Sequence, residues 1–107
     1  MARKISILIV DDEESVRDSL YNWFIEDGYR VECAENARKA LSMLESESID
    51  IILADIKMPG MDGLEMLKRI KALNKEAIVI MMTAFATVTT AVEALKDGAF
   101  DYVTKPF

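Results

Sequence analysis

Histidine is absent from the 107-residue sequence, and cysteine occurs only once, as Cys33. Without histidine the chain can form neither a Ser-His-Asp nor a Cys-His nucleophile system, and it excludes zinc sites with histidine ligands. A single cysteine cannot form an intramolecular disulfide, and this count suits a reducing cytoplasm. Any chemistry must therefore come from carboxylates, lysine, hydroxyl groups or a bound hard metal ion.

Positive charge and long apolar runs are also scarce. The chain has 13 Lys and Arg residues against 19 Asp and Glu, a net charge of −6. Such a surface repels phosphate backbones, so nucleic acid is a poor candidate ligand. No apolar run approaches the ~20 residues that span a bilayer, and Ile5–Val10 is too short for a signal peptide. With 51% hydrophobic residues, we expect one cytoplasmic domain whose core needs no disulfide or metal.

Short apolar runs rich in β-branched residues predict the strands. Three are nearly continuous in hydrophobicity, as strands buried on both faces of a parallel sheet are: Ile5–Val10, Ile49–Ala54 and Ala77–Met82. Two weaker candidates are Tyr29–Ala34 and Ala99–Thr104.

Segments with helical periodicity separate these runs. The apolar spacing of three and four residues covers Val16–Phe24, Ala37–Leu44, Met66–Leu73 and Val88–Leu95. Gly28 and Gly98 are placed to end helices, Asp62 with Glu65 forms a capping pair, and Trp23 is expected at the core or its edge. Regular alternation of strand and helix predicts an α/β domain with a parallel sheet. Because the last strand has no helix after it, we expect a fifth helix past Phe107.

Polar residues gather where the predicted strands end. Asp11 and Asp12 follow the first run, Asp55 the third, Thr83 the fourth and Lys105 the fifth. In open α/β sheets, ligands bind beyond the carboxyl ends of the strands. We therefore expect three carboxylates, a hydroxyl and an ammonium to converge on one edge of the sheet.

Three adjacent carboxylates repel one another, and a hard divalent cation resolves that repulsion. Mg²⁺ prefers oxygen ligands and is commonly held by one or two carboxylates together with phosphate oxygens. Beside it, an oxygen of Asp55 could attack phosphorus while the ion neutralises charge on the transferring phosphoryl group. Lys105 would supply a second positive charge, and Thr83 a hydroxyl for a phosphoryl oxygen.

These residues resemble a known family. The similarity to the receiver domain of bacterial two-component response regulators covers the whole chain, residues 1–107. The motifs that carry it are Asp11-Asp12, Asp55 within Leu53–Gly63, Thr83-Ala84 and Lys105-Pro106-Phe107. The resemblance implies a flavodoxin-like, doubly wound five-stranded parallel sheet in the order 2-1-3-4-5, with its last helix missing from this chain.

The resemblance also assigns roles to the metal and phosphoryl site. It implies that Asp55 accepts a phosphoryl group from a phosphohistidine on a sensor histidine kinase, or from a small phosphodonor. Asp12 would bind Mg²⁺ directly, Asp11 at least partly through water, and Asp55 would be a further ligand. The backbone carbonyl of Lys57 would complete the protein ligands.

A second group of residues would respond to phosphorylation. By resemblance, Thr83 and Lys105 bind the phosphoryl oxygens, and Tyr102 is the aromatic switch residue that turns inward when Thr83 moves. The Lys105-Pro106 bond is expected to be cis. We also expect the side chains of Lys57 and Phe85 to screen the phosphoryl group from water.

A finer resemblance concerns the output of the signal. Residues Met82–Thr87 and Ala91–Tyr102 are similar to receivers of nitrogen-regulatory-protein-C-type, sigma-54-dependent activators. In that subfamily an ATPase domain and a DNA-binding domain follow the receiver, and a receiver homodimer is a further option. The expected function is therefore a regulatory phosphoacceptor switch in transcription, not an enzyme.

Other interpretations remain open at this point. Asp11 and Asp12 could be an acidic helix start, Thr83 a helix cap and Tyr102 a packing residue. The chain could be a stand-alone phosphorelay carrier or a phosphorylation-independent binding module. An aspartate-based phosphotransferase or phosphatase of the haloacid-dehalogenase type is disfavoured, because its second acid would stand where this chain has Lys57.

Overall fold

Strands and helices alternate along the chain, as the hydrophobic pattern predicts. The computed structural model describes residues 4–83 and 88–105. In chain order, the elements are β1 (Ser6–Val10), α1 (Glu14–Glu26), β2 (Arg30–Ala34), α2 (Ala37–Ser46), β3 (Ile51–Asp55), α3 (Gly63–Leu73), β4 (Ile78–Thr83), α4 (Val88–Lys96) and β5 (Asp101–Thr104). All five predicted strands and all four predicted helices are present, with small shifts at their ends.

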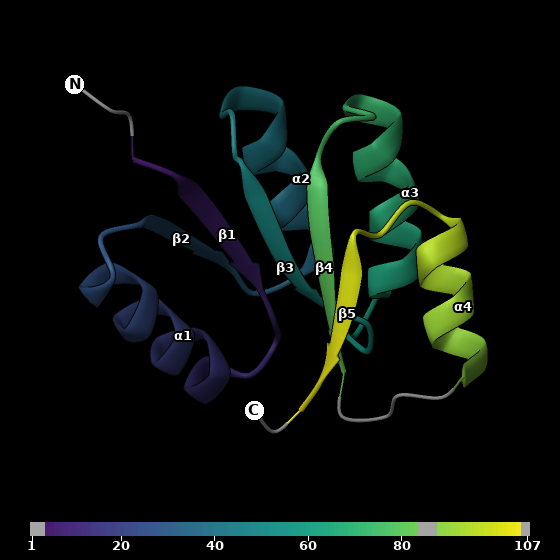
Figure 1. The fold of residues 1–107 in the computed structure, drawn as a ribbon, viewed down its shortest axis with the longest axis horizontal. Coiled ribbons are helices and arrows are strands. Elements are labelled where there is room, and N and C mark those ends of the chain that lie inside the picture. Colours follow the sequence, from purple (N-terminus) through teal and green to yellow (C-terminus); the bar gives the residue numbers. More distant parts are fainter. Residues whose placement is uncertain (1–3, 84–87, 106–107) are drawn as a thin grey trace.

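The strands form one parallel sheet in the order β2-β1-β3-β4-β5, which confirms the predicted flavodoxin-like topology. Helix α1 lies against one face of the sheet, and α2, α3 and α4 lie against the other (Figure 1). Among the described residues, α1 is the only helix on its face. The predicted site lies at the carboxyl ends of β1 and β3, which are neighbouring strands in this sheet.

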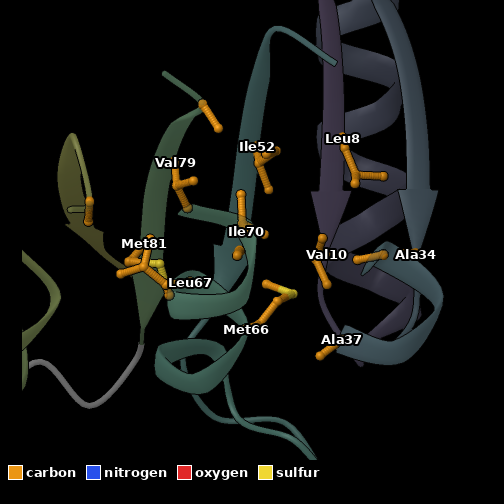
Figure 2. Packing of buried hydrophobic residues seen from close by; sticks show 14 of the residues in the cluster. Leu8, Val10, Ala34, Ala37, Ile52, Met66, Leu67, Ile70, Val79 and Met81 are labelled. Atoms are coloured by element: carbon orange, nitrogen blue, oxygen red, sulfur yellow. The ribbon is translucent and has the colours of Figure 1, made fainter. Parts of the chain in front are cut away.

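Alternate side chains of the central strands enter two separate cores. In β1, Leu8 and Val10 pack toward α2 and α3, whereas Ile7 and Ile9 pack toward α1. Figure 2 shows the larger core, in which side chains of β1, β3 and β4 meet those of α3. The fully buried side chains on the α3 side of this contact are Met66, Leu67 and Ile70. Burial on both faces explains why these strands are almost continuously apolar in sequence.

Some large apolar side chains lie outside the core, contrary to the periodicity. The side chain of Trp23 is 57% exposed and stacks on Phe24, with ring centroids 6.2 Å apart. In α4, Val92 and Leu95 are exposed, while the buried face carries Ala91 and Ala94. Small residues on that face let α4 pack closely, so the larger ones point outward.

The ends of β3 differ from the prediction for a local reason. Asp50 does not extend the strand, because its Oδ2 accepts hydrogen bonds from the backbone N–H of Ser6 (2.8 Å) and from the Ser6 hydroxyl (3.0 Å). At the other end, Asp55 still pairs with Met82 of β4. The strand therefore begins at Ile51 and carries Asp55 as its last residue.

The helix ends follow the predicted signals. Oδ1 of Asp62 accepts a hydrogen bond from the backbone N–H of Glu65 at 2.9 Å, which confirms Asp62 as the N-cap of α3. Gly28 follows α1 and Gly98 follows α4, with φ angles of 90° and 104°. Residues that carry a side chain rarely adopt such angles, so glycine suits both helix ends. None of the helices found in residues 4–83 and 88–105 is long and apolar enough to cross a bilayer.

Candidate functional site

Three carboxylates meet at the carboxyl ends of β1 and β3, as the sequence predicts. Asp11, Asp12 and Asp55 each place a carboxylate oxygen within 4.8 Å of the others. Asp11 is fully buried and Asp55 is 5% exposed, whereas Asp12 is open to solvent. The cluster thus has a buried floor formed by two acids and an exposed rim formed by the third.

Lys105 is the cation of this cluster. Its backbone N–H donates a 2.8 Å hydrogen bond to the carbonyl of Thr83, which places the residue at the end of β4 and β5. Its Nζ lies 2.5 Å from Oδ2 of Asp11 and 3.3 Å from Oδ2 of Asp55. The longer contact to Oε1 of Glu13 is 4.0 Å. One ammonium therefore bridges the two buried acids.

The charges of the site shift the pKa values of two groups. Burial and the neighbouring charge of Asp11 raise the pKa of Asp55, and Lys105 offsets only part of this effect. Burial alone would lower the pKa of Lys105, but its hydrogen bonds and charge interactions with Asp11 and Asp55 outweigh burial and raise it. Burial is thus the main reason that the Asp55 carboxylate is less readily ionised than usual, and Lys105 compensates for it in part.

The loop after β3 holds Asp55 by its backbone. Oδ1 of Asp55 accepts a hydrogen bond from the backbone N–H of Lys57 at 3.3 Å. The N–H of Ile56 donates to the carbonyl of Met82, and the N–H of Gly63 donates to the carbonyl of Ile56 at 2.7 Å. These bonds tie the loop to β4 and to the start of α3, so the Asp55 carboxylate has a fixed direction.

Comparisons with known proteins identify the family of this chain. Residues 7–107 match the response regulator receiver domain family. The chain belongs to this family. The regulatory protein AtoC of Escherichia coli strain K12 is 50% identical over 101 residues, which are 94% of this chain and 22% of AtoC. The chain thus spans under a quarter of that relative, and as a receiver domain it is a regulatory phosphoacceptor unit instead of an enzyme.

Solved receiver structures have the same fold. The beryllofluoride-activated NtrC4 receiver domain dimer is 36% identical with a TM-score of 0.91, and the match covers 95% of this chain and 84% of that one. A response regulator from Burkholderia pseudomallei, solved with a phosphorylated aspartic acid, a calcium ion and citrate, is 31% identical with a TM-score of 0.92. That match covers 97% of this chain and 61% of the other. The resemblance to receivers of the NtrC type is confirmed.

Thr83, the predicted phosphoryl-binding hydroxyl, and Tyr102, the predicted switch residue, lie on the adjacent strands β4 and β5. Thr83 is the last residue of β4 and is buried, at 2% exposure. Tyr102 in β5 is half-buried and packs against the larger core. Their roles in signalling stay predictions. The predicted cis Lys105-Pro106 bond and the predicted screening by Phe85 fall outside the described residues.

Two neighbours of the receiver's acidic cluster escaped the sequence analysis. Nη1 of Arg17 donates a 2.8 Å hydrogen bond to the backbone carbonyl of Asp11. A Cβ on Gly63 would overlap the backbone of Asp55 and Ile56. Hydrophobic periodicity predicts neither contact. In both, a residue of a helix lies against the backbone at the end of a strand, which the pattern of apolar side chains does not report. The spacing of a basic residue one turn into α1 after two acids is the only available hint for Arg17.

The donor set suits a hard divalent cation. All three clustered side chains offer carboxylate oxygens, the donor type that Mg²⁺ and Ca²⁺ prefer. Exposure of Asp12 leaves one side of the cluster open to water, which Mg²⁺ retains in its coordination shell. Such an ion would also neutralise the excess of negative formal charge in a cluster where one ammonium faces three carboxylates. The residues present therefore fit a divalent cation site.

Substituting Lys105 by alanine should destabilise the receiver when no divalent cation is present. The change leaves Asp11 and Asp55 buried without their shared ammonium, and breaking a buried pair costs about 3–5 kcal/mol. Because the pKa of Asp55 is already raised, the deficit is largest at neutral pH and shrinks as acid protonates that carboxyl group.

Urea unfolding in a chelating buffer checks this prediction, with Lys39→Ala on the exposed face of α2 as the control. We expect the Lys105 variant alone to lose stability, and added Mg²⁺ to restore part of it. Equal free energies of unfolding for wild type and Lys105→Ala would contradict the role of Lys105 as the counter-ion.

Proposed function

We propose that Asp55 is the phosphoacceptor of this receiver domain. The observation that carries the proposal is the buried Asp55 carboxylate, with two acids within 4.8 Å and the Lys105 ammonium at 3.3 Å. The donor would be a phosphohistidine on a sensor histidine kinase, or a small acyl phosphate. The phosphorylated aspartic acid in the similar Burkholderia pseudomallei structure supports this reaction.

The reaction forms one bond and breaks one. A carboxylate oxygen of Asp55 attacks phosphorus, and the bond between phosphorus and the imidazole nitrogen, or the acyl oxygen, breaks on the opposite side. Because Lys105 fixes Oδ2 and the Lys57 N–H fixes Oδ1, the attacking group is oriented before the donor arrives. Burial of Asp55 keeps bulk water away from the reacting centre.

We further propose that Asp11, Asp12, Asp55 and the backbone carbonyl of Lys57 hold Mg²⁺. When bound, the ion supplies positive charge that neutralises the phosphoryl oxygens during transfer. Lys105 then pairs with a phosphoryl oxygen in place of the Asp55 carboxylate, and the Thr83 hydroxyl donates to another. The similar Burkholderia pseudomallei structure contains a calcium ion together with its phosphorylated aspartic acid, which supports the use of a divalent cation.

Phosphorylation would act as a switch through the new charge and acceptor oxygens on Asp55. Movement of Thr83 toward the phosphoryl group would let Tyr102 turn inward, which changes the surface formed by α4 and β5. By resemblance to receivers of NtrC-type activators, we propose that ATPase and DNA-binding output domains receive this signal in the cytoplasm. The NtrC4 receiver dimer supports a homodimer as the signalling form.

Incubation of the purified chain with Mg²⁺ and a small acyl phosphate tests the proposed reaction. We expect the intact mass to rise by one phosphoryl group, and peptide mapping after borohydride trapping to place the group on Asp55. Chelation of the divalent cation should lower labelling by about 100-fold, since charge neutralisation by the metal supplies several kcal/mol to the transition state. Labelling at another residue, or undiminished labelling in chelator, would overturn the proposal.

A further inference from the structure

Arg17 reaches from α1 to the backbone of the acidic cluster. Its side chain is half-buried, and Nη1 donates a 2.8 Å hydrogen bond to the backbone carbonyl of Asp11. That carbonyl belongs to the peptide group that joins Asp11 to Asp12. The guanidinium therefore contacts the one piece of backbone that connects two of the three clustered acids.

The other polar groups of Asp11 are held by different partners. Its backbone N–H donates to the carbonyl of Ala34 in β2 at 3.2 Å. Its Oδ1 accepts from the N–H of Glu13 at 2.9 Å, and its Oδ2 accepts from Lys105. These bonds fix the Asp11 side chain and the peptide before it. The peptide after it is held by two contacts: the Glu13 hydrogen bond, which closes a turn across Asp12, and the Arg17 hydrogen bond to its carbonyl.

Asp12 has no comparable support of its own. Its carboxylate is exposed, and within residues 4–83 and 88–105 it makes no side-chain hydrogen bond or ion pair. Its position relative to Asp11 and Asp55 therefore follows from the backbone on which it stands. A tilt of the Asp11–Asp12 peptide would therefore move the Asp12 carboxylate relative to Asp55.

We propose that Arg17 is a positioning residue for the divalent cation site, which it serves by fixing the Asp11–Asp12 peptide. This inference rests on the proposed function of the acidic cluster. Loss of the arginine has two opposite consequences for a cation: the site loses a nearby positive charge, which favours binding, and Asp12 loses its fixed position, which disfavours it. The guanidinium is half exposed and thus screened by solvent, so the loss of position dominates.

The magnesium affinity of Arg17 variants tests this role. The dissociation constant for Mg²⁺ is obtained from the rise of the unfolding midpoint with magnesium concentration, which separates binding from stability. We expect Arg17→Met to weaken binding about 10-fold, as for other groups that orient metal ligands. Arg17→Lys, which keeps the charge but loses the planar guanidinium, should weaken it about 3-fold. The matched control is Arg38→Met, at an exposed position of α2, which should leave the dissociation constant for Mg²⁺ unchanged.

Each other outcome overturns one specific claim. If Arg17→Met lowers the unfolding midpoint in chelator but binds Mg²⁺ as tightly as wild type, Arg17 is only structural and the inference is wrong. Tighter binding would show that charge dominates, which also overturns it. Should Arg17→Met fail to fold, an unchanged dissociation constant for Arg17→Lys is decisive against the inference. A wild-type chain that does not respond to Mg²⁺ would instead refute the proposed cation site.

Discussion

Substitution of Asp55 by asparagine should abolish phosphoryl labelling of the receiver. The amide has nearly the shape of the carboxylate but lacks the nucleophilic anion, so the substitution removes the proposed attacking oxygen. The labelling rate with acyl phosphate and Mg²⁺ should fall by more than about 100-fold, the order expected when a nucleophile is removed. Intact-mass spectrometry over time gives the rates.

The stability of the Asp55 variant separates lost chemistry from lost folding. An acid whose folded pKa is raised destabilises the protein once the pH exceeds that pKa, because folding then disfavours the ionised form. Asp55→Asn removes this penalty, so in chelator at neutral pH the variant should unfold at higher urea concentration than wild type. A variant that is both stable and unlabelled confirms the role of Asp55.

Asp62 provides the matched control for Asp55. It lies in the same loop between β3 and α3, is exposed, and caps α3 through its Oδ1, which asparagine can replace. Asp62→Asn should therefore be labelled at the wild-type rate. Comparable labelling of Asp55→Asn and Asp62→Asn would show that Asp55 is not the acceptor.

The location of the site was predictable because sheet topology constrains it. Parallel strands end at a common edge, so acids that directly follow two neighbouring strands must meet, and Asp11 and Asp55 do so. Lys105 could be placed at this edge for the same reason, because it follows the fifth strand. Its distances to the two acids could not be predicted from the sequence. Sequence periodicity thus fixes which strand end a residue occupies, and the packing of neighbouring strands fixes the contacts.

Burial was less predictable than topology, for a different reason. Periodicity reports which side chains are apolar, whereas burial also depends on the element that packs against them. Trp23 continues the apolar stripe of α1 yet is 57% exposed, since it lies at the margin of the contact between the helix and the sheet. In α4 the alanines make the contact, so Val92 and Leu95 remain at the surface. To predict the burial of such side chains, one must know how the helix and the sheet are placed relative to one another.

Substitution of Gly63 by alanine should strongly destabilise the receiver, although helix propensity alone predicts a gain. Alanine at an early helical position is preferred over glycine by as much as about 1 kcal/mol. Here, however, the new Cβ would overlap the carbonyl oxygen of Asp55 and lie 2.8 Å from Cα of Ile56. Both obstacles are backbone and cannot rotate away, so we expect a net loss of about 3 kcal/mol, at the upper end for an overpacked site.

The same overlap links stability to chemistry. To admit the methyl group, α3 must move away from the end of β3, which stretches the 2.7 Å hydrogen bond from Gly63 to Ile56 and shifts Asp55. Labelling by acyl phosphate should therefore slow by about 10- to 100-fold even where the variant is fully folded, because a displacement of about 1 Å can cost that much.

Gly60→Ala tests whether steric overlap is the cause. Gly60 lies in the same loop with a φ of 81° and has no atom within 4 Å of an added Cβ. Its substitution should cost only the strain of a left-handed residue, about 1–2 kcal/mol, and leave the labelling rate near that of wild type. Urea unfolding and labelling rates, measured for both variants, show whether steric overlap at Gly63 is the cause of the loss. A Gly63→Ala variant no worse than Gly60→Ala in both measurements would mean that α3 can retreat without moving Asp55.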